Sequence, residues 1–363
     1  MLESTTPTAA HVMTLAQSFR GGGVERAMLR MANGWVAAGR RVTLILGSGE
    51  GPLAQEMPDG LSVIELGDTA YRALMAMPAL AREHRPDLIF IPGNHYTGVA
   101  AWTRLRMGKG APPIVAKVSN SLVRSDMHGI GAWAYRRWLR SHPRFCDHIV
   151  AMTRATAAEA VREMRIAPER VSVIPNPPAL PRTDAAPVPL PTGRYLLGVG
   201  RLEPQKRWER LIEAFARLDI PDLSLLLLGE GSARDALEAQ VAQLGIGDRV
   251  MLPGYAADPM PAMRGAALVA LTSDFEGVPG AVNEALALGT PVVATESSVS
   301  IRELIAAENG SIVAPGDGDA LVGALAHWLS PGTQRPTPRV ASGIDSNAAY
   351  LALFDRLVAQ RGR

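Results

Sequence analysis

Two short apolar runs near the end of the chain, residues 267–271 and 291–294, constrain the fold more than any other part of the sequence. Each has the length and composition of a strand buried in a parallel sheet. The segment between them has two glycines and a proline over 275–280, which predicts a loop, and then helix-forming residues over about 281–288. Because Gly289 follows directly, we expect the helix to end there. The order strand, loop, helix, strand indicates an α/β protein.

The pattern predicts different positions for two glutamates of this stretch. Glu276 falls in the loop after a strand, at the edge where open parallel sheets bind their ligands. Glu284 lies about one turn into the helix and can face the same edge. The backbone amides at the start of the helix suit hydroxyl groups or phosphate oxygens. We therefore predict that a carboxylate binds a polyhydroxylated ligand beside amides that hold an anion. Taken alone, the two glutamates could equally be solvated surface residues with no role in binding.

Length and composition limit the class of protein. A chain of 363 residues with 47% hydrophobic residues predicts a soluble protein of two domains. No run of about 18 apolar residues occurs, so no membrane-spanning helix is predicted. The N-terminus is acidic and polar, which predicts no secretion signal. Cys146 is the only cysteine, which excludes an intramolecular disulfide and a cysteine-based zinc site. We expect a protein of the reducing cytoplasm.

Charge is balanced overall, at +2, but not along the chain. Residues 1–180 contain 21 Lys and Arg against 14 Asp and Glu, so this half favours an acidic partner or surface. Aromatic and basic residues alternate at 133–140 and 102–109, as in helices that lie in an anionic membrane interface. Core tryptophans beside solvated arginines would give the same pattern. No nucleic-acid partner is expected, because the charge is modest and no binding motif accompanies it.

The first half begins with a predicted βαβ unit. A strand at 11–15 is followed by three glycines and then by a helix over 24–38. The bare amides of Gly22 and Gly23 can approach an anion or a sugar closely. Their spacing does not match a dinucleotide-binding fingerprint, so a plain tight turn is the alternative.

A histidine follows a later strand of this half. His95 comes just after the predicted strand at 87–91, where it could contact a ligand or serve as a structural hydrogen-bonding group. The other strands of this half are predicted at 41–46, 114–118, 148–152 and 171–175.

A proline-rich segment divides the chain. Such a segment is stiff and extended, and we assign it to an interdomain linker. The predicted divisions are an N-terminal domain at 1–178, the linker at 179–194, a C-terminal domain at 195–340 and a terminal helical segment at 341–363. The C-terminal domain again alternates strands (195–200, 223–229, 249–252) with helices (208–218, 233–244, 258–266).

Arg201 and Lys206 lie five residues apart on the loop after the first strand of that domain. Two cations so placed can neutralise a diphosphate and stabilise it as a leaving group, although alone they would also fit solvated surface charges. Two α/β domains are expected to place a cleft between the carboxyl ends of their strands. Together with Glu276 and Glu284, the cations predict one shared ligand, a nucleoside diphosphate bonded to a sugar.

At this point the sequence resembles a known family. The motifs are GGGVER at 21–26, IPNP at 174–177, GRLEPQKR at 200–207, LLGEG at 227–231, LPGY at 252–255 and EGVPGAVNEALALGTPVVAT at 276–295. They resemble the family-four retaining glycosyltransferases of the GT-B fold, across nearly the whole chain. The resemblance implies two Rossmann-like domains, an acceptor-side one first and a nucleotide-sugar-binding one second, and a C-terminal helix packing back on the first. It implies transfer of a hexose from a nucleotide sugar, with no bound metal or other cofactor.

The resemblance also implies roles for individual residues. Glu276 matches the residue that contacts the donor hexose, and Glu284 the one that contacts the nucleotide ribose. Arg201 and Lys206 match the residues that hold the diphosphate, and His95 falls where the family has a donor-side histidine. The other positions expected at the donor site are Gly22, Gly23, Gly200, Gly229, Tyr255, Gly277, Val278, Pro279, Gly280 and Ala281.

Some positions depart from the family pattern and leave the donor open. Val278 stands where many relatives have a phenylalanine, and Gly280 and Asn283 replace larger or apolar residues. We expect a UDP-sugar first and GDP-mannose next. An Asp-Gly-Asp sequence at 317–319 resembles a metal-binding motif, but we interpret Asp319 as the N-cap of the helix that follows.

The acceptor is predicted from the basic aromatic first domain. A lipid-linked oligosaccharide or growing glycan, met by a cytoplasmic enzyme bound peripherally to the inner face of an anionic membrane, fits these features. The alternatives are a sugar-nucleotide epimerase with the same donor pocket and a non-catalytic protein that only binds nucleotide sugars.

Overall fold

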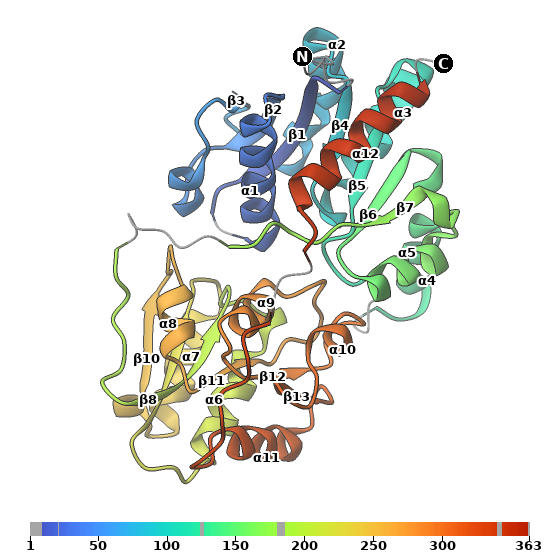
Figure 1. Ribbon diagram of the computed structural model, residues 1–363. Helices are drawn as coiled ribbons and strands as arrows, with labels where there is room; N and C mark the ends of the chain where they lie inside the picture. Colours follow the sequence, from blue (N-terminus) through green and yellow to red (C-terminus); the bar gives the residue numbers. More distant parts are fainter. Residues whose placement is uncertain (1–8, 21, 124–126, 180–185, 340–342, 362–363) are drawn as a thin grey trace, which may run out of the picture. The chain divides into compact units, whose positions relative to one another are not determined.

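The computed structural model describes residues 9–20, 22–123, 127–179, 186–339 and 343–361, and these form two compact units (Figure 1). The first unit contains Met1–Pro177 and Ile344–Arg363, and the second contains Pro178–Gly343. Each unit is built on a sheet whose neighbouring strands run parallel. The α/β class predicted from the sequence is confirmed.

The sheet of the first unit has the order β3-β2-β1-β4-β5-β6-β7 within the described residues. Its strands are β1 (His11–Ser18), β2 (Arg41–Ser48), β3 (Ser62–Glu65), β4 (Leu88–Ile91), β5 (Ile114–Lys117), β6 (His148–Ala151) and β7 (Val171–Val173). The order changes direction between β1 and β4. Loops that follow these two strands therefore lie at a topological switch point, where open parallel sheets bind ligands.

Helices cover both faces of this sheet. They are α1 (Gly23–Ala37), α2 (Met77–His84), α3 (Thr97–Met107), α4 (Gly129–Leu139), α5 (Arg154–Met164) and α12 (Ser346–Arg361). In β4, Leu88 and Phe90 belong to the core cluster shared with α1 and α12. Ile89 and Ile91 belong to the cluster shared with α2, α3 and α5. Strands covered on both faces need apolar residues at every position, which explains why β4 reads as a continuous apolar run.

The C-terminal helix α12 packs beside α1 on one face of the first sheet (Figure 1). Tyr350 and Phe354 of α12 lie edge-on or tilted to Trp35 of α1 and Phe90 of β4, with ring centroids between 5.1 and 6.0 Å apart. Such aromatic contacts add to the stabilisation gained by burial. The last helix of the chain therefore completes the core of the first unit.

The sheet of the second unit has the order β10-β9-β8-β11-β12-β13 within the described residues. Its strands are β8 (Arg194–Val199), β9 (Leu223–Leu228), β10 (Val250–Gly254), β11 (Leu268–Leu271), β12 (Val292–Thr295) and β13 (Gly310–Val313). The order changes direction between β8 and β11. This switch point receives the loop with Arg201 and Lys206 and the loop with Glu276.

Two groups of helices cover the faces of the second sheet. One core cluster joins the strands to α6 (Trp208–Ala216), α7 (Arg234–Gln243) and α11 (Gly318–Trp328). The other joins them to α8 (Met260–Gly265), α9 (Gly280–Ala287) and α10 (Ile301–Leu304). The loop and helix predicted between residues 275 and 288 are present, with α9 beginning at Gly280.

The assignment of Asp319 as a helix N-cap is wrong. Asp317 is the N-cap of α11, and its Oδ1 accepts a hydrogen bond from the amide of Ala320 at 2.9 Å. Asp319 instead pairs with Arg217, with Nη2 and Oδ1 2.5 Å apart. An N-cap side chain reaches an amide two or three residues on, so the earlier aspartate has the better spacing.

Candidate active site

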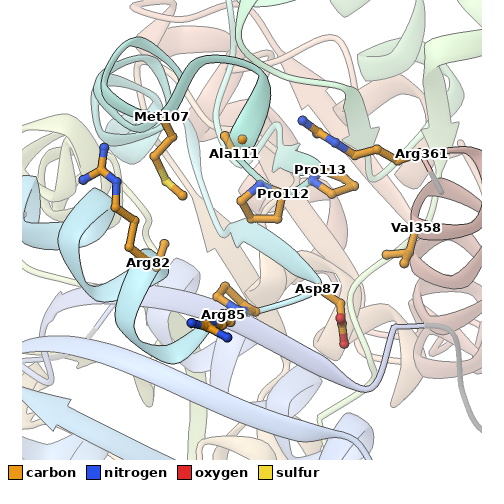
Figure 2. A pocket seen from close by; sticks show the side chains of 12 residues that line it. Arg82, Arg85, Asp87, Met107, Ala111, Pro112, Pro113, Val358 and Arg361 are labelled. Atoms are coloured by element: carbon orange, nitrogen blue, oxygen red, sulfur yellow. The ribbon is translucent and has the colours of Figure 1, made fainter.

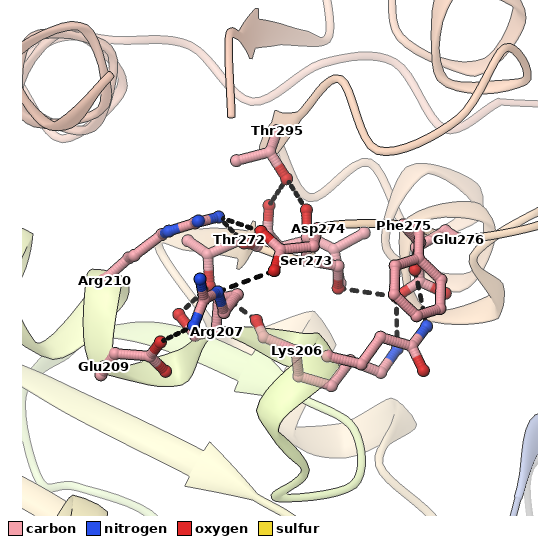
Figure 3. A network of polar contacts seen from close by, with 12 residues as sticks. Lys206, Arg207, Glu209, Arg210, Thr272, Ser273, Asp274, Phe275, Glu276 and Thr295 are labelled. Atoms are coloured by element: carbon pink, nitrogen blue, oxygen red, sulfur yellow. Dashed lines mark hydrogen bonds and ion pairs between the residues drawn. The ribbon is translucent and has the colours of Figure 1, made fainter. Parts of the chain in front are cut away.

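The loops after β8 and β11 bring two of the predicted residues into contact (Figure 3). Lys206 Nζ donates to Glu276 Oε1 at 2.6 Å, and Ser273 Oγ donates to the same oxygen at 2.6 Å. The side chain of Lys206 is 17% exposed and that of Glu276 is 11% exposed, so the pair is mostly buried but a ligand can still reach it. Because both bonds end on Oε1, they fix the carboxylate and leave Oε2 to meet a ligand.

A further network of ion pairs connects the two loops next to this pair. Asp274 pairs with Arg207 at 2.8 Å and with Arg210 at 2.7 Å. Gln205 accepts a hydrogen bond from the Asp274 amide at 3.0 Å and donates from Nε2 to the carbonyl of Phe275 at 2.6 Å. The position of Lys206 relative to Glu276 is therefore set by contacts of the residues that flank Lys206 and of those that precede Glu276 (Figure 3).

Arg207 is held in an unusual backbone conformation. Its φ is +54°, in the left-handed region that residues other than glycine seldom adopt. Its carbonyl accepts a hydrogen bond from Thr272 Oγ1 at 2.9 Å. The ion pair with Asp274 and this bond offset the local strain, so the turn that presents Lys206 is kept in one conformation.

The predicted glycines of this unit allow backbone segments to approach. A Cβ atom on Gly229 would lie 1.9 Å from the carbonyl oxygen of Gly200, and φ of Gly229 is +156°. A Cβ on Gly200 would lie 3.3 Å from Cε of Lys206. Gly229 is therefore required for packing between the ends of β8 and β9, while Gly200 borders the lysine.

Hydrogen bonds from two serines fix the turn before α9. Ser298 and Ser300 both donate to the carbonyl of Gly277, at 2.8 and 2.6 Å. Pro279 is the N-cap residue and provides no side-chain hydrogen bond, so the first amides of α9 are not capped by it. Val278, Gly280 and Ala281 complete this turn and the first helical positions, as the sequence predicts.

Other predicted donor-site residues lie near this edge of the sheet. Arg201 is exposed, and its side chain has no hydrogen bond or ion pair within the described residues. Glu284 is half-buried on α9, and Tyr255 is half-buried just after β10. Within the described residues, no cluster of three or more His, Cys, Asp or Glu is arranged to hold a metal.

The predicted residues of the first unit lie at its own switch point. Gly22 is the N-cap of α1 and Gly23 its first residue, whereas Gly21 lies outside the described residues. His95 is exposed in a 3-10 turn after β4, and its Nε2 lies 3.2 Å from Gln17 Oε1 at the end of β1. Its ring packs edge-on against Tyr71 and Tyr96.

Sequence reasoning missed a polar cluster at the same edge. Tyr96 donates to Glu25 Oε1 at 2.8 Å, and Lys117 at the end of β5 donates to Asn176 Oδ1 at 2.5 Å. Lys117 is 1% exposed. Burial lowers the pKa of Lys117 to about 7, and the charge of Glu25 acts in the opposite direction. The signal available in the sequence was the lysine at the end of an apolar strand.

A cavity of about 520 Å³ lies at the other edge of the first sheet (Figure 2). Its lining residues include Arg85 and Asp87, just before β4, and Pro112 and Pro113, just before β5. These are the amino ends of the strands, whereas parallel sheets bind ligands at the carboxyl ends. The cavity is therefore not counted in the candidate site.

Two doubly wound parallel units, each with a switch point at the carboxyl ends of its strands, define the architecture as GT-B. A model described as Glycosyltransferase Family 4 matches residues 21–178, and one described as Glycosyl transferases group 1 matches residues 183–338. The chain belongs to the family-four glycosyltransferases.

Curated relatives match parts of the chain. An N-acetylgalactosaminyltransferase of Campylobacter jejuni, which acts on N-acetylgalactosamine-N,N'-diacetylbacillosaminyl-diphospho-undecaprenol, is 38% identical over 31% of this chain and 30% of its own length. The lipopolysaccharide 1,6-galactosyltransferase of Salmonella typhimurium is 30% identical over 51% of this chain and 53% of its own length. The chain thus matches between 30% and 53% of the length of these relatives.

Solved structures match the fold over nearly the whole chain. Anabaena HepE in complex with UDP and glucose has a TM-score of 0.71 at 20% identity, covering 97% of this chain and 98% of that protein. The sucrose-phosphate synthase of Thermosynechococcus elongatus has a TM-score of 0.72 at 20% identity, covering 97% of each chain. These similarities confirm the GT-B architecture.

Proposed function

We propose that this protein transfers a hexose from a nucleoside-diphosphate sugar, a UDP-sugar before GDP-mannose, to a lipid-linked or growing glycan. The observation that carries the proposal is the Lys206–Glu276 pair, fixed by Ser273 at the switch point of the second unit. A cation and a sugar-binding carboxylate side by side suit a ligand whose diphosphate adjoins its sugar. The complex of HepE with UDP-glucose supports a UDP-sugar, by analogy of fold.

In this proposal the residues divide the donor between them. Arg201 and Lys206 bind the diphosphate and stabilise the charge that it gains when the bond to the anomeric carbon breaks. Glu276 accepts hydrogen bonds from the hexose, and Glu284 binds the ribose. Because the two cations supply the positive charge, the reaction proceeds without a metal or other cofactor. The family resemblance supports retention of the anomeric configuration.

The proposed acceptor agrees with the names of two relatives. The Campylobacter relative acts on a sugar linked through a diphosphate to undecaprenol, and the Salmonella relative is named for lipopolysaccharide. Both acceptors are glycans attached to a lipid. A protein that uses such an acceptor needs to work at a membrane surface, and within the described residues no helix is long and apolar enough to cross one.

Helix α4 offers a surface for that purpose. Leu139 is its only buried residue, whereas Ile130 is 85% exposed and Trp133 56% exposed. Arg136 and Arg137 are exposed on the same helix, and residues 127–146 contain no Asp or Glu. Exposed apolar rings beside arginines suit the headgroup layer of an anionic bilayer. We therefore propose peripheral membrane binding through α4, on the cytoplasmic face.

The second basic aromatic segment, 102–109, does not support this proposal equally. Trp102 donates from its ring to the carbonyl of Met75 at 3.0 Å, and Arg104 forms an ion pair with Asp147. These two side chains serve the packing of the first unit. The membrane proposal is therefore limited to α4.

An acceptor screen tests the proposed transfer. Radiolabelled UDP- and GDP-sugars would be incubated with N-acetylglucosamine linked through a diphosphate to a short polyprenol, and with chelator present. We expect a product with a retained anomeric centre from one UDP-sugar. Release of a free epimerised sugar without acceptor would identify an epimerase instead. Tight donor binding without any turnover would identify a non-catalytic binding protein.

Vesicle sedimentation tests the membrane surface. We expect binding to phosphatidylglycerol vesicles but not to phosphatidylcholine vesicles, and weaker binding as salt screens the charges. The R136E/R137E variant should lose this binding. The control R72E/R264E makes the same change in net charge at exposed arginines elsewhere and should keep it. Equal binding by the two variants would contradict the role of α4.

A further inference from the structure

The N-terminus of α1 is already occupied by a carboxylate of the protein. Glu25 is the third residue of α1, and a Cβ atom on Gly22 would lie 2.3 Å from Glu25 Oε2. The side chain thus folds back over the N-cap residue, where the helix dipole favours negative charge. A ligand phosphate at this turn would meet a carboxylate instead of bare amides.

One oxygen of Glu25 is held and the other is available. Tyr96 donates to Oε1 at 2.8 Å and accepts a hydrogen bond from the Gln17 amide at 3.1 Å. Tyr96 is 2% exposed, and burial together with the charge of Glu25 raises the pKa of its phenol, which therefore stays a donor. Glu25 Oε2 has no hydrogen-bond partner in the described part of the chain.

Lys117 and Asn176 stand behind this carboxylate. The ammonium group of Lys117 is buried and bonds only to Asn176 among the described side chains. A buried cation needs a nearby negative charge, and Glu25 is the acidic group whose charge acts on Lys117. The charge of Glu25 thus acts on Lys117 from one side, while Oε2 remains open to a ligand.

The geometry points to Glu25 as the residue that binds a hydroxyl group of the sugar acceptor through Oε2, an assignment that rests on the proposed function. A carboxylate only accepts hydrogen bonds, so its free oxygen calls for a donor. A sugar hydroxyl is such a donor, whereas a phosphate adds acceptors and like charge. Gln17 and His95, which lie 3.2 Å apart beside Tyr96, add polar atoms on which further hydroxyls can bond.

Two variants test this assignment in the full-length protein. Glu25→Gln keeps the shape of the side chain but removes its charge, and Gly22→Ala places a methyl group 2.3 Å from Oε2, which forces that oxygen to move. The acceptor is N-acetylglucosamine linked through a diphosphate to a short polyprenol. We expect the acceptor KM to rise about 10-fold or more in E25Q and to rise in G22A, in the range for a lost charged hydrogen bond. UDP affinity by calorimetry should stay within about twofold.

The control variant is Glu169→Gln, an exposed carboxylate of the same unit that lies before β7, at the amino edge of the sheet. It should change neither the acceptor KM nor the UDP affinity. An acceptor KM of E25Q within twofold of wild type overturns the assignment. So does a parallel loss of UDP affinity, which a merely structural role would produce. If wild type binds UDP but transfers nothing, the proposed function fails first, and the acceptor site fails with it.

Discussion

Removing the charge of Glu276 should strengthen the binding of free UDP even though it impairs sugar transfer. In the ligand-free protein, Lys206 is paired with Glu276 at 2.6 Å. A diphosphate that binds Lys206 must share it with this carboxylate and must also tolerate a nearby negative charge. The variant Glu276→Gln keeps the side-chain shape and removes both obstacles. Donor turnover should fall, because the hexose loses its charged hydrogen-bond partner.

The magnitude follows from the partial burial of the pair. Two like charges about 6 Å apart repel by roughly 3 kcal/mol at an effective dielectric constant of about 20. Both side chains retain some exposure, 17% for Lys206 and 11% for Glu276, so salt and water reduce this value. We therefore expect the binding free energy of UDP to become more favourable by about 1 kcal/mol, which corresponds to about a fivefold lower Kd for UDP.

Isothermal titration calorimetry with UDP and with pyrophosphate would measure this effect at low and high salt. The control Ser273→Ala removes the other hydrogen bond to Glu276 Oε1 but keeps the charge, and should change the Kd by less than about twofold. Glu213→Gln, an exposed carboxylate on α6, controls for net charge. If E276Q binds UDP no more tightly than wild type, the carboxylate does not compete with the diphosphate and the reasoning is wrong.

Three further predictions concern catalysis and stability. R201A and K206A should each lower kcat/KM by about 100-fold or more, measured with saturating acceptor and chelator, because each removes a cation that stabilises the leaving diphosphate; turnover unchanged in both would contradict this role. Burial lowers the pKa of Lys117 from 10.5 to about 7, so between these values the unfolded chain binds one proton more than the folded chain. The unfolding free energy of wild type relative to K117M should therefore rise by about 1.4 kcal/mol per pH unit from about pH 7.5 to 10 in denaturant titrations, and parallel curves would refute this. Burial pushes the pKa of Asp355 upward, but hydrogen bonds from Arg40 and the Ala9 amide and the Arg40 charge hold it below its ordinary value. D355N should therefore cost about 1–3 kcal/mol at neutral pH, and the difference should vanish as the pH falls through the lowered pKa; a constant difference in acid would exclude the ion pair as its cause.

Local sequence signals were sufficient to place the loops of the second unit that contain Lys206 and Glu276. The loop around Glu276 could be predicted because glycine and proline interrupt it between two short apolar runs, and these signals act over a few residues. The contact of Lys206 with Glu276 spans 70 positions, and it follows from the rule that adjacent parallel strands bring their following loops together. The pairing of Asp274 with Arg207 was not predicted, because surface charges carry no periodic signal.

The cluster in the first unit shows where such reasoning ends. Lys117 lies in an apolar strand, and its partner Asn176 lies 59 positions away in a loop. Nothing in the local pattern distinguishes a buried lysine from one whose ammonium reaches solvent at the end of the strand. Helix α4 shows the same limit, because the spacing of Trp133 and Arg136 fits a buried face and an exposed one equally. Only the tertiary structure separates these cases.

The position of α12 in the first unit has a consequence for how the protein is made. Tyr350 and Phe354 complete the core around Trp35, yet the whole second unit is synthesised before them. At typical elongation rates, the first sheet waits on the order of ten seconds with the part of that face beside α1 uncovered. The second unit is one continuous segment and can fold while still attached to the ribosome, whereas the first can be completed only after the final helix emerges.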